Sequence, residues 1–143
     1  MLESITTIKV RYAETDKMGY VYYGNYATFY EVGRTELMRT LGLSYKEMED
    51  QGIFMPVLDL HCKYIRPAHY DDTLRIRTYV NEMPETRIKF YYEIFNNTTN
   101  QLLNKGETTL VFLNAKTYRP TKAPSWFLDI IKEKLQSGKK NNN

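Results

Sequence analysis

Hydrophobic and polar positions alternate with a period of two over several stretches of the chain. Such alternation is typical of strands with one buried and one exposed face. The stretches are Ser4–Ala13, Phe54–Ile65, Thr73–Met83, Thr86–Asn96 and Gln101–Asn114. The connections Met83–Glu85 and Asn96–Asn100 are short, polar and rich in turn formers, which is typical of hairpins. We therefore expect the later strands to follow one another in an antiparallel meander.

A helical period replaces the alternation between Asn25 and Leu43. Its apolar stripe consists of Tyr26, Phe29, Tyr30, Gly33, Leu37, Met38 and Leu41. Asn25 is the predicted N-cap, and Gly42 fits the end of the helix. A glycine inside a helix costs about 1 kcal/mol relative to alanine. We therefore expect Gly33 to make a close packing contact that offsets this cost.

Two shorter helices complete the pattern. Ser44–Gln51 begins with the capping-box spacing of Ser44 and Glu47, and a C-terminal helix starts at Ser125 and is expected to end just before Gly138. One long striped helix against a sheet of about five antiparallel strands buries both apolar faces, which predicts an α+β fold in two layers. We predict a single domain over residues 1–136, followed by a polar, disordered tail over residues 137–143.

Composition narrows the range of functions. A chain of 143 residues suits one domain with a real core, and a net charge of +3 is too small to indicate a nucleic-acid partner. Cys62 is the only cysteine, so the chain cannot form an internal disulfide, which fits a reducing compartment. No apolar run approaches the ~20 residues of a membrane span. We expect a soluble cytoplasmic protein without a membrane partner.

The candidate chemistry lies just before the long helix. Asp16 precedes it, and the free N–H groups at a helix N-terminus attract developing negative charge. A carboxylate in this place can attack a carbonyl group or activate a water molecule. The plainer alternative is that Asp16 only stabilises the helix dipole. Glu14 is a competing carboxylate, and we expect it to form a surface ion pair instead.

Other kinds of site find little support in the sequence. His61 and His69 are the only histidines, and neither has metal-ligand spacing with a partner, so no metal site is predicted. The chain also lacks a glycine-rich phosphate loop, a G-x-S-x-G motif and a dinucleotide fingerprint.

One long motif resembles a known family. The run YAETDKMGYVYYGNY (Tyr12–Tyr26) is similar to the signature of hotdog-fold acyl-CoA thioesterases, closest to the 4-hydroxybenzoyl-CoA thioesterase branch. Ile65–Ala68 followed by Asp71 and Asp72, and Tyr92–Ile94, resemble further blocks of that branch. The resemblance implies a long central helix wrapped by a curved antiparallel five-stranded sheet. It also implies a homodimer or homotetramer with active sites at the subunit interface.

The resemblance gives roles to particular residues. Asp16 takes the place of the catalytic nucleophile or general base, and the backbone N–H near Tyr23 that of the group polarising the thioester carbonyl. A neighbouring branch has a histidine at the Tyr23 position, which is absent here. For substrate binding, the candidates are Tyr22, Asn25 and Tyr26 near the acyl group and Arg87 and Lys89 near the coenzyme A phosphates. The tyrosines could equally pack in the core, and the two basic residues could belong to a solvated face. No cofactor is implied.

Three functions follow as hypotheses. The first is hydrolysis of an acyl-CoA, with an aryl or a short- to medium-chain acyl group, to a carboxylic acid and coenzyme A. The second is a non-catalytic module that binds acyl-CoA or an acyl carrier protein thioester. The third is a hotdog dehydratase, which would need a histidine near the pocket, whereas His61 and His69 both lie outside the Asp16 motif.

Overall fold

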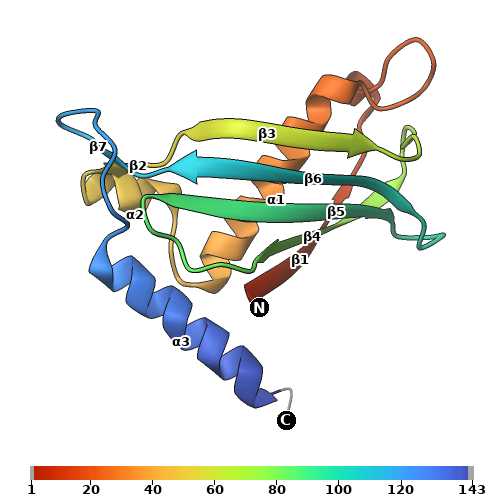
Figure 1. Ribbon diagram of the computed structural model, residues 1–143. Coiled ribbons are helices and arrows are strands. Elements are labelled where there is room, and N and C mark those ends of the chain that lie inside the picture. Colours follow the sequence, from red (N-terminus) through yellow and green to blue (C-terminus); the bar gives the residue numbers. More distant parts are fainter. Residues whose placement is uncertain (1, 142–143) are drawn as a thin grey trace.

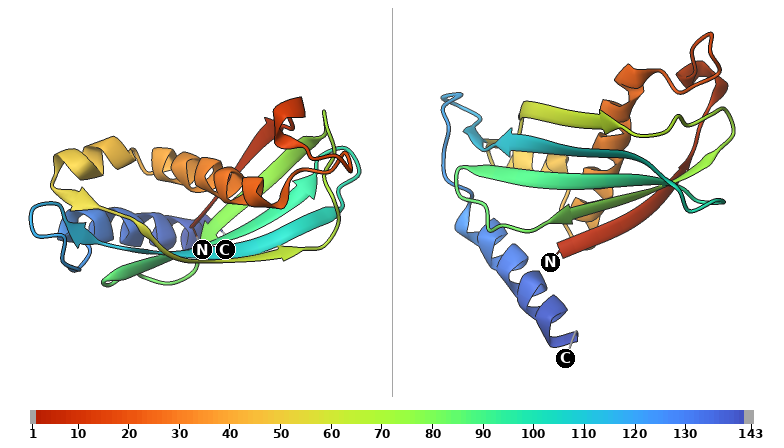
Figure 2. Two further views of the ribbon diagram at one scale, coloured as in Figure 1. Left: turned by 90° about the horizontal axis from the view of Figure 1, so that it is seen from above. Right: turned by 45° about the vertical axis from the view of Figure 1, so that its right-hand side comes forward.

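The computed structural model describes residues 2–141, with side chains described as far as residue 136. A five-stranded antiparallel sheet in the order β1-β4-β5-β6-β3 curves around helix α1 (Figures 1 and 2). The strands are β1 (Leu2–Lys9), β2 (Ile53–Phe54), β3 (Val57–Tyr64), β4 (Thr73–Val80), β5 (Arg87–Asn96), β6 (Leu102–Val111) and β7 (Leu113–Asn114). The helices are α1 (Tyr26–Thr40), α2 (Tyr45–Asp50) and α3 (Ser125–Asn141), and two 3-10 turns are η1 (Tyr12–Glu14) and η2 (Tyr23–Asn25). This arrangement confirms the predicted α+β class.

The core lies between α1 and the sheet, as the two periodicities predict. Every residue of the α1 stripe is buried, and β4 and β5 bury alternate side chains toward the helix. Tyr30 of α1 stacks on Tyr92 of β5 with 4.2 Å between the ring centroids. A Cβ atom on Gly33 would lie 2.3 Å from Thr78 Oγ1, which confirms the expected close contact of that glycine with the sheet.

The predicted meander is correct only in part. The hairpins β4–β5 and β5–β6 form as expected, but β3 pairs with β6 and not with β4. In this register Val57 lies opposite Leu110 and Tyr64 opposite Asn104. The chain must therefore cross from β3 at one side of the sheet to β4 near the other, through residues 65–72. Local alternation carries no information on such long-range pairing.

Two predicted strands are each divided in the structure. Phe54–Ile65 separates into β2 and β3 at Met55–Pro56, because a proline has no N–H to donate to a ladder. Gln101–Asn114 separates into β6 and β7 at Phe112, whose ring is fully buried and packs against Phe127 of α3. β2 and β7 pair with each other in a second, two-stranded sheet.

Asn25 holds the predicted N-cap position of α1 without a capping hydrogen bond, the predicted Ser44 cap is right, and the predicted end of α3 is wrong. Asn25 has helical backbone angles within η2 and donates its side-chain amide to the Glu14 carbonyl (2.8 Å), so it does not cap α1. Ser44 Oγ does accept the Glu47 N–H at 3.1 Å. α3 continues through Gly138 to Asn141. A glycine weakens a helix without necessarily ending it. Residues 142 and 143 of the predicted tail lie outside the described residues, and the domain boundary stays a prediction.

β3 forms an edge of the main sheet, with β6 as its one neighbour there. None of its side chains is fully buried, and Val57, Leu58, Leu60 and Tyr64 are 43–52% exposed. A long edge strand with exposed apolar side chains invites pairing with another chain. This edge lies along the upper side of the sheet in Figure 1, next to the N-terminal end of α1.

Candidate active site

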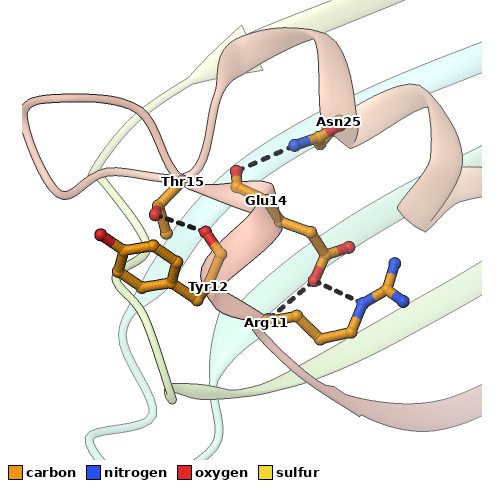
Figure 3. A network of polar contacts seen from close by, with 5 residues as sticks. All are labelled: Arg11, Tyr12, Glu14, Thr15 and Asn25. Atoms are coloured by element: carbon orange, nitrogen blue, oxygen red, sulfur yellow. Dashed lines mark hydrogen bonds and ion pairs between the residues drawn. The ribbon is translucent and has the colours of Figure 1, made fainter.

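Backbone hydrogen bonds hold the Asp16 loop against the start of α1. The Glu14 carbonyl accepts the Tyr22 N–H (2.9 Å) and the Asn25 side-chain amide (2.8 Å). Figure 3 shows this contact and the Glu14 carboxylate, which accepts the Arg11 N–H and pairs with the Arg11 guanidinium at 3.4 Å. The expected ion pair of Glu14 is confirmed, although its side chain is only 12% exposed. Glu14 therefore anchors the loop.

Asp16 itself is half-buried and fixed by its own turn. Its Oδ1 accepts the Met18 N–H at 2.9 Å, and its backbone N–H donates to the Tyr20 carbonyl at 2.8 Å. Gly19 closes this turn with φ +80°, a left-handed conformation that glycine adopts without strain. Among the described residues, Asp16 Oδ2 has no hydrogen-bond partner. The carboxylate is thus oriented by one oxygen while the other is free to react.

The Tyr23 N–H lies at the first position of η2, which runs directly into α1. The first N–H groups of a helical segment have no acceptor within it. In the described part of the chain no other group accepts this N–H, while the Tyr23 carbonyl accepts the Tyr64 hydroxyl at 3.1 Å. The prediction of a free backbone donor at this position fits the observed geometry.

Asp16, Tyr23 and Tyr26 line one cavity of about 260 Å³. Its other walls are Met18, Tyr20, Val21, Tyr64, Ile65, Arg66 and Pro67. The Tyr64 ring meets Tyr26 edge-on, with 5.3 Å between centroids, and Tyr23 in the same way at 6.4 Å. The cavity therefore combines one carboxylate and one arginine with an apolar wall of tyrosine and aliphatic side chains.

The predicted binding residues Tyr22 and Asn25 do not line this cavity. The Tyr22 side chain is exposed and packs on Tyr23 with 4.6 Å between ring centroids. Asn25 is occupied by the Glu14 carbonyl. In this chain both residues support the wall and do not form it.

Arg87 and Lys89 lie at the far end of the sheet from Asp16. Arg87 pairs with Val111 on β6, level with the start of β3, whereas the Asp16 cavity adjoins Tyr64 at the end of β3. Seven residues of strand separate the two levels, or about 23 Å. Lys89 pairs with Glu107 at 3.4 Å. One chain alone therefore does not bring these basic residues to the carboxylate.

Sequence reasoning missed Tyr64, Ile65, Arg66 and Pro67 as cavity walls. Ile65–Ala68 was noted only as part of the family resemblance. The loop that carries them is joined to the Asp16 loop by the Val21 N–H, which donates to the Ala68 carbonyl at 2.8 Å, and by a bridge between Tyr20 and His69. The one sequence signal for these walls was the family motif at Ile65–Ala68, because no local periodicity connects that segment with the Asp16 loop.

Tyr26 and Tyr64 remain protonated at neutral pH. Burial raises the pKa of Tyr26 to about 12. Burial and the neighbouring Cys62 thiol raise the pKa of Tyr64 to about 12 as well. The Tyr26 hydroxyl can therefore donate a hydrogen bond to a ligand, whereas the Tyr64 hydroxyl donates to the Tyr23 carbonyl. Among the described residues, no cluster of histidine, cysteine and carboxylate groups could hold a metal ion, and no helix is long and apolar enough to span a membrane.

Comparison with known proteins agrees with this geometry. The model of the thioesterase-like superfamily matches residues 10–131. The chain belongs to this superfamily. The acyl-CoA thioester hydrolase YbgC of Escherichia coli is 32% identical over 117 residues, which cover 82% of this chain and 87% of that protein.

Solved structures of this superfamily share the fold. A DHNA-CoA thioesterase from Staphylococcus aureus aligns with a TM-score of 0.88 and 39% identity, covering 100% of this chain and 97% of that one. A 4-hydroxybenzoyl-CoA thioesterase mutant in complex with 4-hydroxybenzoyl-CoA aligns with a TM-score of 0.82 at 18% identity, covering 91% and 99%. The hotdog fold and the assignment to thioester hydrolases are confirmed at the level of the family.

Proposed function

We propose that this thioesterase-superfamily protein hydrolyses an acyl-CoA to a carboxylic acid and free coenzyme A, with Asp16 as the reacting carboxylate. The observation that supports the proposal is the cavity that Asp16 shares with Tyr23, the first residue of η2 ahead of α1. A carbonyl oxygen on the Tyr23 N–H gains stabilisation as it becomes negative, and such a donor is worth about 10²–10³ in rate. The tyrosines and aliphatic side chains of the wall suit an aryl acyl group or a short to medium chain.

Asp16 could bring about hydrolysis of the thioester by either of two routes. As a nucleophile, Asp16 adds to the thioester carbonyl carbon, coenzyme A leaves as the thiolate, and water cleaves the resulting anhydride. As a general base, Asp16 takes a proton from water while the water oxygen adds to the same carbon; the tetrahedral intermediate then expels coenzyme A, which leaves with that proton as the thiol. A single turnover in water labelled with oxygen-18 tests for the anhydride. Label in the peptide that contains Asp16 assigns the nucleophile, whereas label found only in the acid product arises from a general base or from attack of water on the acyl carbon of the anhydride.

The active unit in this proposal is a dimer formed through β3. Identical strands that pair about a two-fold axis run antiparallel, so the start of one β3 lies beside the end of the other. The Arg87 and Lys89 end of the partner subunit then faces the Asp16 cavity. The exposed apolar edge of β3 supports this pairing. Together with Arg66 at the cavity, these basic residues would hold the coenzyme A phosphates.

Replacing Asp16 with asparagine tests the proposed function. Thiol release from a panel of acyl-CoA esters should fall at least 10²-fold, the usual scale of a lost acid or base, while binding of the ester persists. Asp50→Asn is the matched control, because Asp50 is exposed on α2 and pairs only with Lys46. Glu14→Gln tests the competing carboxylate and should keep the chemistry. Full thiol release by Asp16→Asn would exclude the proposal, and binding without any release by the wild type would indicate the non-catalytic module.

A further inference from the structure

A second, open cavity of about 630 Å³ lies beside the middle of α1. It is lined by residues of α1, α2, β2, β7 and the start of β3, and it shares no residue with the Asp16 cavity. Its walls are Glu31, Arg34, Tyr45, Met48, Glu49, Ile53, Phe54, Met55, Pro56, Val57, Leu113 and Tyr118. This volume is within the range of small-molecule sites, about 300–1,000 Å³.

Arg34 is the unusual member of this cavity. Only 9% of it is exposed, and among the described residues none of the ion pairs includes it. Its Nε and the Tyr45 hydroxyl are both buried without a hydrogen-bond partner of acceptable geometry. Buried charges are normally paired, and an unsatisfied buried polar group costs about 1–3 kcal/mol. The Arg34 guanidinium lies beside the hydroxyls of Tyr45 and Tyr92, so its Nε is the donor that the chain itself leaves unused.

The position of this cavity indicates what fills it. Val57 at the start of β3 is one wall of the Arg34 cavity, and Tyr64 at the end of β3 is one wall of the Asp16 cavity. When two copies pair antiparallel along β3, each Arg34 cavity comes next to the Asp16 cavity of the partner subunit. Neither cavity alone needs to hold a whole acyl group, because the two join across the interface.

We propose that the Arg34 cavity receives the far end of the acyl group whose thioester lies at Asp16 of the partner subunit, and that the Arg34 guanidinium donates to a hydroxyl oxygen on that acyl group. This proposal rests on the proposed function. It makes Arg34 and Tyr45 specificity-determining residues that act across the dimer interface. In the chain alone Arg34 Nε and the Tyr45 hydroxyl are covered, so these two groups reach the ligand after the side chains turn toward the cavity.

The charges of the cavity favour a hydroxyl over a carboxylate. Glu31 and Glu49 line it together with Arg34, so a third carboxylate would enter beside two negative charges and one positive charge. A hydroxyl can accept from Arg34 and donate to a neighbouring carboxylate. The remaining walls, such as Met48 and Ile53, suit an apolar ring or chain that carries this single polar group.

Paired substrates test this inference. The values of kcat/KM are measured for benzoyl-CoA, its three monohydroxy derivatives and its 4-carboxy derivative. We expect wild-type protein to favour one hydroxylated ester over benzoyl-CoA by at least about tenfold, since a site that hydrogen-bonds a hydroxyl rejects the analogue without it. In Arg34→Met this ratio should fall toward one, and in Tyr45→Phe, which loses one oxygen atom only, it should fall in part. Arg39→Met, on the same helix but exposed and paired with Glu36, should keep the ratio.

Mixed dimers test whether Arg34 of one subunit and Asp16 of the other form one site. Subunits that carry Asp16→Asn and Arg34→Met are coexpressed with different tags, and the mixed dimer is purified through both. If the site is shared between subunits, one of its two sites retains both native residues and the wild-type substrate ratio returns. If each chain builds its own site, the mixed dimer shows only the ratio of Arg34→Met, and the inference is wrong.

Failure of this inference is distinct from failure of the proposed function. Absence of thiol release from every ester would contradict the function itself. Release that depends on Asp16, with the same ratio in wild type, Arg34→Met and Tyr45→Phe, would contradict only the role of Arg34. A preference for the 4-carboxy ester would also overturn it. Circular dichroism and thermal melting establish that each variant is folded.

Discussion

At the scale of single residues, Asp16 is held by backbone groups and not by a charged neighbour. The Met18 N–H fixes one oxygen, and the Tyr20 carbonyl fixes the backbone of Asp16 from the other side of the turn. The turn depends on the left-handed conformation of Gly19. A side chain at that position would strain the turn and move the carboxylate relative to Tyr23.

This dependence gives a first prediction. Gly19→Val places a β-branched residue at φ +80° with open space around it, so the cost is backbone strain and not a clash. We expect kcat/KM to fall about tenfold or more, because small misplacements of a catalytic group are costly. Gly42→Val, at φ +76° just beyond the end of α1 and also in open space, is the control for strain alone. Equal activity of the two variants would contradict the role of the turn.

A second residue-scale prediction concerns the packing of α1 on the sheet. In Gly33→Ala the new Cβ would meet Thr78 Oγ1 at 2.3 Å and Ile76 Cγ2 at 3.0 Å. Overpacking of about 1–3 kcal/mol should outweigh the gain of about 1 kcal/mol in helix propensity, for a net loss of up to about 2 kcal/mol. Chemical denaturation measures it. The double variant with Thr78→Ala should recover part of the loss, and a stabilised Gly33→Ala would contradict the close contact.

At the scale of elements, the edge strand β3 is the proposed dimer interface. Its exposed apolar residues would be covered in the proposed dimer, whereas β1 at the opposite edge exposes Ile5. We predict that the wild type sediments as a dimer or a larger even assembly, and that Leu60→Lys shifts it toward the monomer and lowers thiol release. Ile5→Lys, at an equally accessible position on β1, should do neither. A monomeric wild type with full activity would contradict the proposed interface.

The elements themselves were largely predictable from the sequence. Alternation located the strands, and the spacing of the α1 stripe predicted all of the buried residues of α1 except Arg34. The errors came from interactions that local patterns do not record. Pro56 and the burial of Phe112 divided two strands, and Asn25 donated to the Glu14 carbonyl in place of capping α1. The pairing of β3 with β6 depends on contacts far apart in the chain.

At the scale of the whole molecule, the sequence predicted the part of the candidate site that lies in one continuous segment. Asp16 and the Tyr23 N–H follow from a continuous motif, whereas Tyr64 and Arg66 reach the cavity because β3 ends beside the Asp16 loop. In the proposed dimer, the place of Arg87 at the site depends on a second chain. No single-chain pattern could give that geometry.

The many buried tyrosines give a prediction for the stability of the whole molecule. Burial raises the pKa of Tyr26 to about 12 and raises the pKa values of Tyr30, Tyr45 and Tyr92 as well. In the unfolded chain these groups ionise near pH 10, so the unfolded state loses protons first. The stability they contribute is complete below pH 10 and is lost as the pH rises toward the folded pKa values.

Chemical denaturation at pH 9, 10, 11 and 11.5 measures this effect. The free energy of unfolding should be flat up to about pH 9.5 and then fall by up to about 1.4 kcal/mol per pH unit for each such tyrosine. Tyr26→Phe should make this slope less steep by up to about 1.4 kcal/mol per pH unit, the contribution of one proton. The same slope in both proteins would contradict the burial of an un-ionised Tyr26.

The central claim is that the carboxylate at position 16 and the N–H at position 23 act on one carbonyl group. A crystal structure of Asp16→Asn with a bound acyl-CoA tests it most directly. The account predicts the thioester oxygen about 2.7–3.1 Å from Tyr23 N and the carbonyl carbon about 3–3.5 Å from the side chain of residue 16, or one water molecule away from it. A thioester bound elsewhere, or one whose carbonyl oxygen points into solvent, would contradict the account.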